Sequence, residues 1–223
     1  EHTMHITTSN QETMNLGFGN YTCNWGTHIC GLYETDLERD EIIFGFLHQG
    51  DLENNLQMYC PVERTTEDFI TTYQSKYPTC ATHVQDTNKF NLFSAKDLYF
   101  PDGRFSPRSM DHGLATYYQQ SQQHGKRQVR ATAEMAWALD AIPGIEHLMV
   151  YESRLNYFIA EKPWISICLY NLTKFSGAMI MKVLQTHPFT ISGGVITKNP
   201  YFQDPDEWLR CNAPEFQGQQ LLP

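Results

Sequence analysis

Residues 25–33 read Trp25-Gly26-Thr27-His28-Ile29-Cys30-Gly31-Leu32-Tyr33, and this largely apolar run predicts a buried strand. His28 and Cys30 are two positions apart, so their side chains leave the same face of such a strand. The next segment changes to helical spacing. A strand followed at once by a helix is where a nucleotide-binding fold places its phosphate loop. Here the junction is Glu34-Thr35-Asp36-Leu37-Glu38, without a glycine-rich turn or a lysine. The pattern therefore favours a ligand site for something other than a phosphate.

The composition limits the class of protein. The 223 residues, 41% of them hydrophobic, suffice for one large domain or two small ones. No apolar run approaches the roughly 18 residues of a membrane span, and no signal-peptide pattern is visible. We therefore expect a cytoplasmic protein without membrane contact. The net charge of −9 argues against direct binding of nucleic acid. The six cysteines include no Cys-x-x-Cys pair, which argues against a disulfide framework and a zinc ribbon.

Hydrophobic patterns along the chain alternate between strand and helix periods. Strands are expected near residues 27–33, 56–60, 90–93, 128–134 and 164–170, with a closing hairpin at 189–192 and 195–197. Helices are expected between them, near 36–50, 65–77, 106–124, 145–161 and 175–186, the first with Asp36 as its N-cap. This order predicts an α/β fold, a three-layer sandwich around a mainly parallel central sheet.

A single domain is expected over residues 25–202. Residues 1–24 are polar and lack periodicity, so they are expected to form a flexible N-terminal arm. Residues 203–223 are expected to form a C-terminal extension.

Ligands of open parallel sheets bind at the carboxyl ends of the strands, so we expect a pocket there. The candidate ligand contacts are His28, Cys30, Glu134, Trp137, Cys168, Tyr170 and His187. Four of them, His28, Cys30, Cys168 and His187, could hold zinc or another soft metal, or supply an axial ligand to a haem or corrinoid. No established ligand-pair spacing is present, and buried cysteines commonly act as small hydrophobes. We therefore expect no cofactor and an apolar small-molecule pocket.

Two further candidates have simpler alternatives. Glu134 follows a strand and could anchor a ligand, or pair with Arg130 or Arg154. Trp137 could cap an apolar pocket or fill the core. On the helix predicted at 145–161, Glu152 and Asn156 are four positions apart and share a face. The chain has no nucleophile elbow or HExxH motif, and His28 and Cys30 are about 6.5 Å apart along a strand. We expect no enzymatic activity.

Six segments together resemble a known family. They are Trp25–Tyr33, Tyr99–Phe105, Thr132–Trp137, Tyr151–Asn156, Ile167–Tyr170 and Leu184–Pro188. In order and spacing they are similar to the methanogen/methylotroph sensory domain, MEDS, which occurs in a dichloromethane-responsive repressor and in archaeal sensor histidine kinases. The resemblance covers about residues 20–202.

The resemblance implies a RecA/KaiC-like core that has lost the phosphate loop. It also implies a signal-transduction or transcription-regulatory module that senses simple hydrocarbon derivatives such as C1 compounds. The partners would be a small organic ligand and an output domain, such as a histidine kinase or a DNA-binding regulator, with a homodimer as one arrangement. The alternative function is a metal- or tetrapyrrole-binding redox sensor or enzyme that uses the cysteines and histidines.

Overall fold

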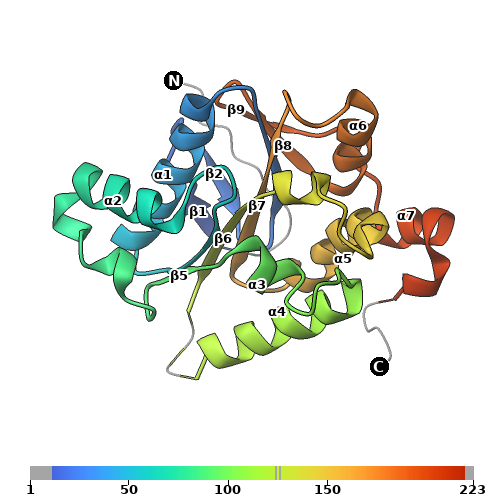
Figure 1. The fold of residues 1–223 in the computed structure, drawn as a ribbon, viewed down its shortest axis with the longest axis horizontal. Helices are drawn as coiled ribbons and strands as arrows, with labels where there is room; N and C mark the ends of the chain where they lie inside the picture. Colours follow the sequence, from blue (N-terminus) through green and yellow to red (C-terminus); the bar gives the residue numbers. More distant parts are fainter. Residues whose placement is uncertain (1–11, 124, 126, 219–223) are drawn as a thin grey trace.

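A seven-stranded sheet crosses the middle of the structure, a computed structural model that describes residues 12–123, 125 and 127–218 (Figure 1). Its strands are β3 (His28–Tyr33), β4 (Leu56–Cys60), β5 (Phe90–Leu92), β6 (Val129–Glu134), β7 (Trp164–Asn171), β8 (Phe189–Ser192) and β9 (Val195–Lys198). Their order across the sheet is β5-β4-β6-β7-β3-β8-β9. All neighbouring pairs are parallel except β8 and β9, which form the expected closing hairpin.

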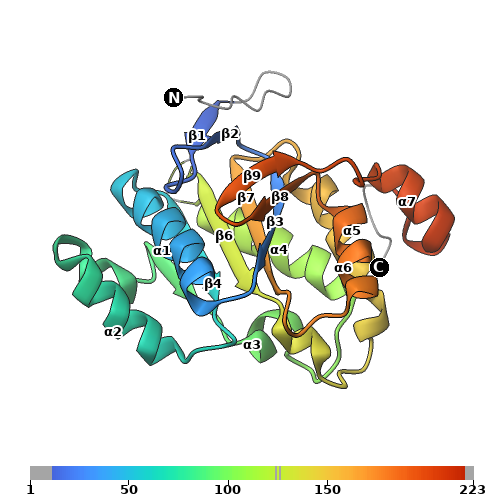
Figure 2. The same cartoon turned by 90° about the horizontal axis from the view of Figure 1, so that it is seen from above.

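Helices cover both faces of this sheet (Figure 2). One face carries α1 (Asp36–Leu52) and α2 (Thr66–Lys76). The other carries α3 (Ala95–Tyr99), α4 (Pro107–Ser121), α5 (Leu148–Ile159), α6 (Gly177–Thr186) and α7 (Pro205–Asn212). The three-layer α/β sandwich predicted from the sequence is thus confirmed.

The N-cap of helix α1 lies one residue earlier than expected from the sequence. Thr35, not Asp36, is its N-cap, and the Thr35 hydroxyl accepts a hydrogen bond from the backbone N–H of Glu38. The Glu38 carboxylate in turn accepts from the Thr35 backbone, which completes a capping box. With either residue as the N-cap, acidic side chains lie in the first turn of α1, where a nucleotide-binding fold holds phosphate.

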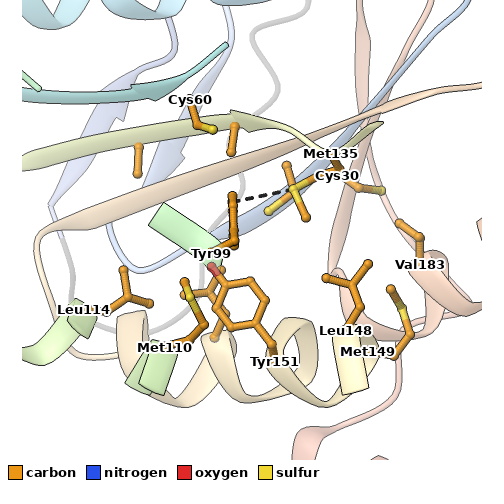
Figure 3. Packing of buried hydrophobic residues seen from close by; sticks show 14 of the residues in the cluster. Cys30, Cys60, Tyr99, Met110, Leu114, Met135, Leu148, Met149, Tyr151 and Val183 are labelled. Carbon is orange, nitrogen blue, oxygen red and sulfur yellow. Dashed lines mark hydrogen bonds between the residues drawn. The ribbon is translucent and has the colours of Figure 1, made fainter. Parts of the chain in front are cut away.

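The sheet separates two apolar cores because successive side chains of a strand point to opposite faces. All eight residues of β7 are buried. Cys30, Cys168 and Tyr170 belong to the core beneath α4 and α5, whereas Ile29 and Ile167 belong to the core beneath α1 and α2. Figure 3 shows the first core, in which side chains of α5, including Tyr151 and Leu148, point toward the sheet.

The segment expected to be a flexible arm is folded over its described part, residues 12–24. It forms an antiparallel ribbon of β1 (Thr13–Asn15) and β2 (Thr22–Asn24). Met14, Leu16 and Cys23 of this segment are buried against the core beneath α1. Each fully buried apolar side chain of this size contributes about 1.5–3 kcal/mol, which explains why so short a ribbon packs. Residues 1–11 of the expected arm lie outside the described part of the chain.

The C-terminal extension also packs on the domain over its described part. Trp208 and Leu209 of α7 are buried in the same core as α5. Among the described residues, no helix has the length and apolar character needed to cross a bilayer.

Candidate functional site

Four polar side chains meet in the core between the sheet and α5. They are His28 at the start of β3, Glu152 of α5, Cys168 of β7 and His187 just after α6. His28 Nε2 lies 3.1 Å and His187 Nε2 3.2 Å from the same carboxylate oxygen, Glu152 Oε2. Cys168 Sγ is 3.5 Å from that oxygen and 3.4 Å from His28 Nε2. We call these four residues the polar cluster.

Strand register and helix packing bring the polar cluster together. Cys30 of β3 lies opposite Cys168 of β7, and His28 lies two residues before Cys30, so His28 and Cys168 share one face of the sheet. Helix α5 crosses this face and contributes Glu152. His187 is the C-cap of α6, and its Nδ1 lies 2.8 Å from the carbonyl oxygen of Val183.

Burial and mutual proximity determine the protonation of the polar cluster. Burial, followed by the charge of neighbouring His187, lowers the pKa of His28 to about 4. Burial would raise the pKa of Glu152, but His187 and His28 outweigh it and hold that pKa well below its usual range. Burial and the nearby Glu152 raise the pKa of the Cys168 thiol well above its usual value. A carboxylate is therefore ionised in the core beside a protonated thiol and an uncharged imidazole.

Tyr170 extends the polar cluster. Its hydroxyl donates to Glu152 Oε1 at 2.7 Å, and its side chain is fully buried. Of the residues expected from the sequence, His28, Cys168, His187 and Tyr170 are thus brought together. Cys30 is also buried, but it belongs to the apolar core shown in Figure 3. It lies opposite Cys168 on the neighbouring strand, and Glu152 takes the place that the sequence had given to Cys30 in a four-ligand set.

The ligand pocket was expected at the carboxyl ends of the strands, whereas the polar cluster extends to the amino end of one strand. His28 is the first residue of β3, so the polar cluster begins near the amino end of that strand. Helix α5, which covers this face of the sheet, contributes Glu152 to the polar cluster there.

Glu134 does lie at a carboxyl end, but in a separate group on the other face. Its Oε2 accepts from the Tyr59 hydroxyl at 3.0 Å and the Val62 backbone N–H at 2.6 Å, and its Oε1 is 3.3 Å from Arg39. Burial raises the Glu134 pKa, although the Val62 N–H and Arg39 oppose this.

The cation that lies beside Glu134 is Arg39, not either of the two expected from the sequence. Arg130 pairs with Glu53, and Arg154 pairs with Asp111. Strand geometry explains the difference, because Arg130 and Glu134 are four residues apart along β6, about 13 Å at the usual rise per residue.

Trp137 fills the core. Its ring stacks on Tyr99 with centroids 4.4 Å apart and is tilted against Phe100 and Phe105, each 5.6 Å away. Tyr99 also lines a cavity of about 30 Å³ between the sheet and α3, α4 and α5. The cavity walls are mainly apolar and include Met58, Ala133 and Cys168.

Cys168 belongs both to this cavity and to the polar cluster, so the apolar space lies next to the buried carboxylate. A second, larger hollow of about 300 Å³ lies between α3 and α4. Met58, Leu98 and Leu114 line both spaces. These three side chains are the only lining residues that the two spaces share among those described, and they separate the cavity from the surface hollow.

The thiol–imidazole contact does not amount to an activated nucleophile. His28 Nε2 is within 3.4 Å of Cys168 Sγ, but burial and Glu152 raise the thiol pKa. Reactive cysteines have a depressed pKa and partial exposure. The Cys168 environment is the opposite, so this thiol lacks the character of an activated nucleophile.

Glu152 is the member of the polar cluster that the sequence did not predict. It was noted for sharing a face with Asn156, but not as a ligand contact. The available signal was its position in the apolar stripe Leu148, Glu152, Leu155 and Ile159, which repeats at helical spacing. A carboxylate in such a stripe points into the core, as the structure shows.

Comparisons with known proteins complete the description. The family model described as MEDS, "MEthanogen/methylotroph, DcmR Sensory domain", matches residues 27–188. The chain is 21% identical over 164 residues to the transcriptional repressor DcmR of Methylorubrum extorquens. That match covers 73% of this chain and 58% of the repressor, so the chain spans little more than half of its curated relative.

Among solved structures, a KaiC-like protein from Pyrococcus horikoshii OT3 superposes with a TM-score of 0.54 at 11% identity, covering 81% of this chain and 80% of that one. At this identity the likeness shows the fold alone, a KaiC-like core. The junction Glu34–Thr35 between β3 and α1 carries no phosphate-loop motif.

Proposed function

Because the chain belongs to the MEDS family of sensory domains, we propose that it senses a simple hydrocarbon derivative, such as a C1 compound, for a regulatory protein. The ligand binds reversibly and is not turned over. The observation that carries this proposal is the apolar cavity of about 30 Å³ beneath α5.

The size and lining of the cavity indicate the ligand class. A cavity needs about 10–15 Å³ to hold one water molecule, so 30 Å³ takes about two such volumes. Pockets for drug-sized ligands are about ten times larger or more. Apolar side chains cannot satisfy the hydrogen bonds of water, so a small apolar molecule has the advantage in this space. Cys168 belongs to both the cavity and the polar cluster, so we propose that polar and apolar ligands are distinguished by their contact with this residue.

The hollow between α3 and α4 supplies a route to the cavity. Leu98 of α3 is only partly buried, and rotation of the Leu98 and Leu114 side chains would open the wall between the two spaces. We propose that these side chains act as a gate. Because Leu98 lines both spaces, substitution Leu98→Ala should speed ligand entry and also enlarge the cavity.

The output is proposed to lie in another domain or protein. The curated relative is a transcriptional repressor, which supports a DNA-binding regulator as the output, and a histidine kinase is the other candidate. The net charge of −9 supports a sensing role without DNA contact by this domain. A ligand can switch such an output only if it binds two states of the domain with different affinity.

The experiment is a thermal-unfolding titration with dichloromethane as the apolar C1 probe and methanol as the polar one. At a concentration of 100 times Kd, a single-site ligand stabilises by about 2.7 kcal/mol. For a domain of this size that shift raises Tm by about 5–11 °C. Dichloromethane should give a saturable increase, and methanol a much smaller one.

A pair of variants ties the effect to the cavity. Ala133→Val adds two methyl carbons inside the cavity and should abolish the dichloromethane response. Ala115→Val adds the same atoms on the exposed side of α4 and should keep it. An equal response in both variants, or no saturable response in the unmodified protein, would refute the proposed site.

A further inference from the structure

We propose that His28, Glu152, Cys168 and His187 bind one divalent transition-metal ion of the zinc type. This inference does not rest on the apolar cavity or its ligand, and it is tested separately. It starts from the polar cluster, whose four donor atoms all lie within 4.8 Å of one another.

The spacing of the donor atoms matches a tetrahedral metal site. Zinc binds imidazole nitrogen and carboxylate oxygen at about 2.0–2.2 Å and thiolate sulfur at about 2.3 Å. A tetrahedron with those bonds has edges of about 3.3–3.5 Å between N or O donors and about 3.6 Å to sulfur. The observed separations are 3.1 and 3.2 Å for the two nitrogen–oxygen edges. They are 3.4 and 3.5 Å for the two edges that end on Cys168 Sγ. Four of the six edges therefore fall close to the values that one central ion requires.

The His187 ring is oriented for coordination. Its Nδ1 lies 2.8 Å from the Val183 carbonyl, which can only accept, so Nδ1 carries the proton. Nε2 then presents its lone pair to the polar cluster. This atom is fully buried and makes no hydrogen bond of acceptable geometry, although Glu152 Oε2 is only 3.2 Å away. Both atoms are satisfied when a cation, either a proton or a metal ion, lies between them.

The remaining partners of the polar cluster resemble the outer shell of a metal site. Tyr170 donates to Glu152 Oε1, the oxygen that does not face the two histidines, and so fixes the carboxylate. Ligating histidines and carboxylates in metal sites are commonly held by outer hydrogen bonds of this type.

Charge and donor type select the ion. Two neutral imidazoles, one carboxylate and one thiolate carry a charge of −2, which a divalent cation cancels in a site without solvent. Metal binding releases the Cys168 proton to solvent. Nitrogen and sulfur donors suit zinc and its neighbours, whereas calcium and magnesium require oxygen donors. Four protein ligands complete a tetrahedron, which is the arrangement of a structural site rather than a hydrolytic one.

The test is a titration of the chelator-treated protein with Co²⁺ as a coloured substitute for Zn²⁺. We expect one Co²⁺ per chain, intense visible bands of tetrahedral cobalt, a thiolate-to-cobalt band in the near ultraviolet, and displacement by Zn²⁺. The matched pair is Cys168→Ser and Cys30→Ser, which replace equally buried thiols on neighbouring strands. Cys168→Ser should lose the thiolate band, and Cys30→Ser should keep it. Tyr170→Phe should weaken Co²⁺ binding by about 10–100-fold while keeping the bands.

Several results would overturn the inference. One is a folded, unmodified protein that takes up no Co²⁺ or Zn²⁺ at micromolar concentration. Another is a thiolate band that disappears in Cys30→Ser and persists in Cys168→Ser. The first of these results is measured on the unmodified protein. The proposal can therefore be refuted even if a variant fails to fold. A negative result here leaves the dichloromethane titration intact, so failures of the two proposals can be distinguished.

Discussion

Tyr170→Phe measures how strongly the buried Glu152 carboxylate depends on its hydroxyl donor. The substitution removes one oxygen atom from a fully buried side chain and leaves the ring packing unchanged. The lost interaction is the 2.7 Å hydrogen bond to Glu152 Oε1. Without it, this buried oxygen of the charged carboxylate has one hydrogen-bond donor fewer.

The size of the effect follows from the charge of the acceptor. A hydrogen bond to a charged group contributes about 1.5–3 kcal/mol, whereas a bond between neutral groups contributes about 0.5–1.5 kcal/mol. Tyr117 provides the neutral comparison, because its hydroxyl donates at the same 2.7 Å to the Asn91 side-chain oxygen. Tyr170→Phe should therefore lower Tm by about 3–12 °C, and Tyr117→Phe by about 1–6 °C.

The assays are thermal unfolding and urea unfolding at pH 7 with a chelator present, both followed by circular dichroism. Both variants should shift the midpoint without changing the m-value, because neither alters the surface exposed on unfolding. If Tyr170→Phe costs no more than Tyr117→Phe, Glu152 is not an ionised acceptor in the folded protein, and the electrostatic description of the polar cluster is wrong.

Three further predictions concern the scaffold. Burial opposes ionisation of Glu63, but hydrogen bonds led by the one from Lys174 lower its pKa below the usual 4.5. A lowered pKa stabilises the fold above pH 4.5 and is lost as pH falls through the folded value, so the stability lost in Glu63→Gln at pH 7 should shrink in acid unfolding curves. Gly144→Ala should lower the free energy of unfolding by at least about 3 kcal/mol. The φ of Gly144 is +89°, which alone costs about 1–3 kcal/mol in a residue with a Cβ, and that Cβ would also lie 2.0 Å from a backbone oxygen. Gly113→Ala, with nothing within 4 Å, should instead gain up to about 1 kcal/mol in the same melts. Thr35→Ala should cost about 1 kcal/mol in urea unfolding through loss of the capping box, and an unchanged midpoint would contradict that cap.

Much of the sheet could be predicted because each buried strand carries its own signal. The run from Trp164 to Tyr170 is almost wholly apolar, and it is the central strand β7, extended by Asn171. The ribbon of β1 and β2 could not be predicted in this way. Each of its strands has three residues, mostly Thr and Asn, and only Met14 and Cys23 at their centres reveal an inner face.

The site was harder to predict because it depends on contacts between distant segments. His28 and Cys168 are 140 residues apart, and their contact requires both the pairing of β3 with β7 and the side of the sheet that each strand presents. The sequence identified three of the four residues in the polar cluster. The fourth, Glu152, depended on which way α5 is rotated, and the periodicity of one helix does not say what lies opposite its inner stripe.

Helix α5 touches two different neighbours through residues that are two positions apart. Glu152 points to the polar cluster, and Arg154 donates to the backbone carbonyl oxygens of Phe216 and Gly218, beyond α7. A rigid helix conveys displacement along its whole length without internal rearrangement. A slide of α5 by a fraction of an ångström at the buried carboxylate would therefore pull on the end of the described chain some distance away. One helix thus connects the buried carboxylate with the last residues of the described chain.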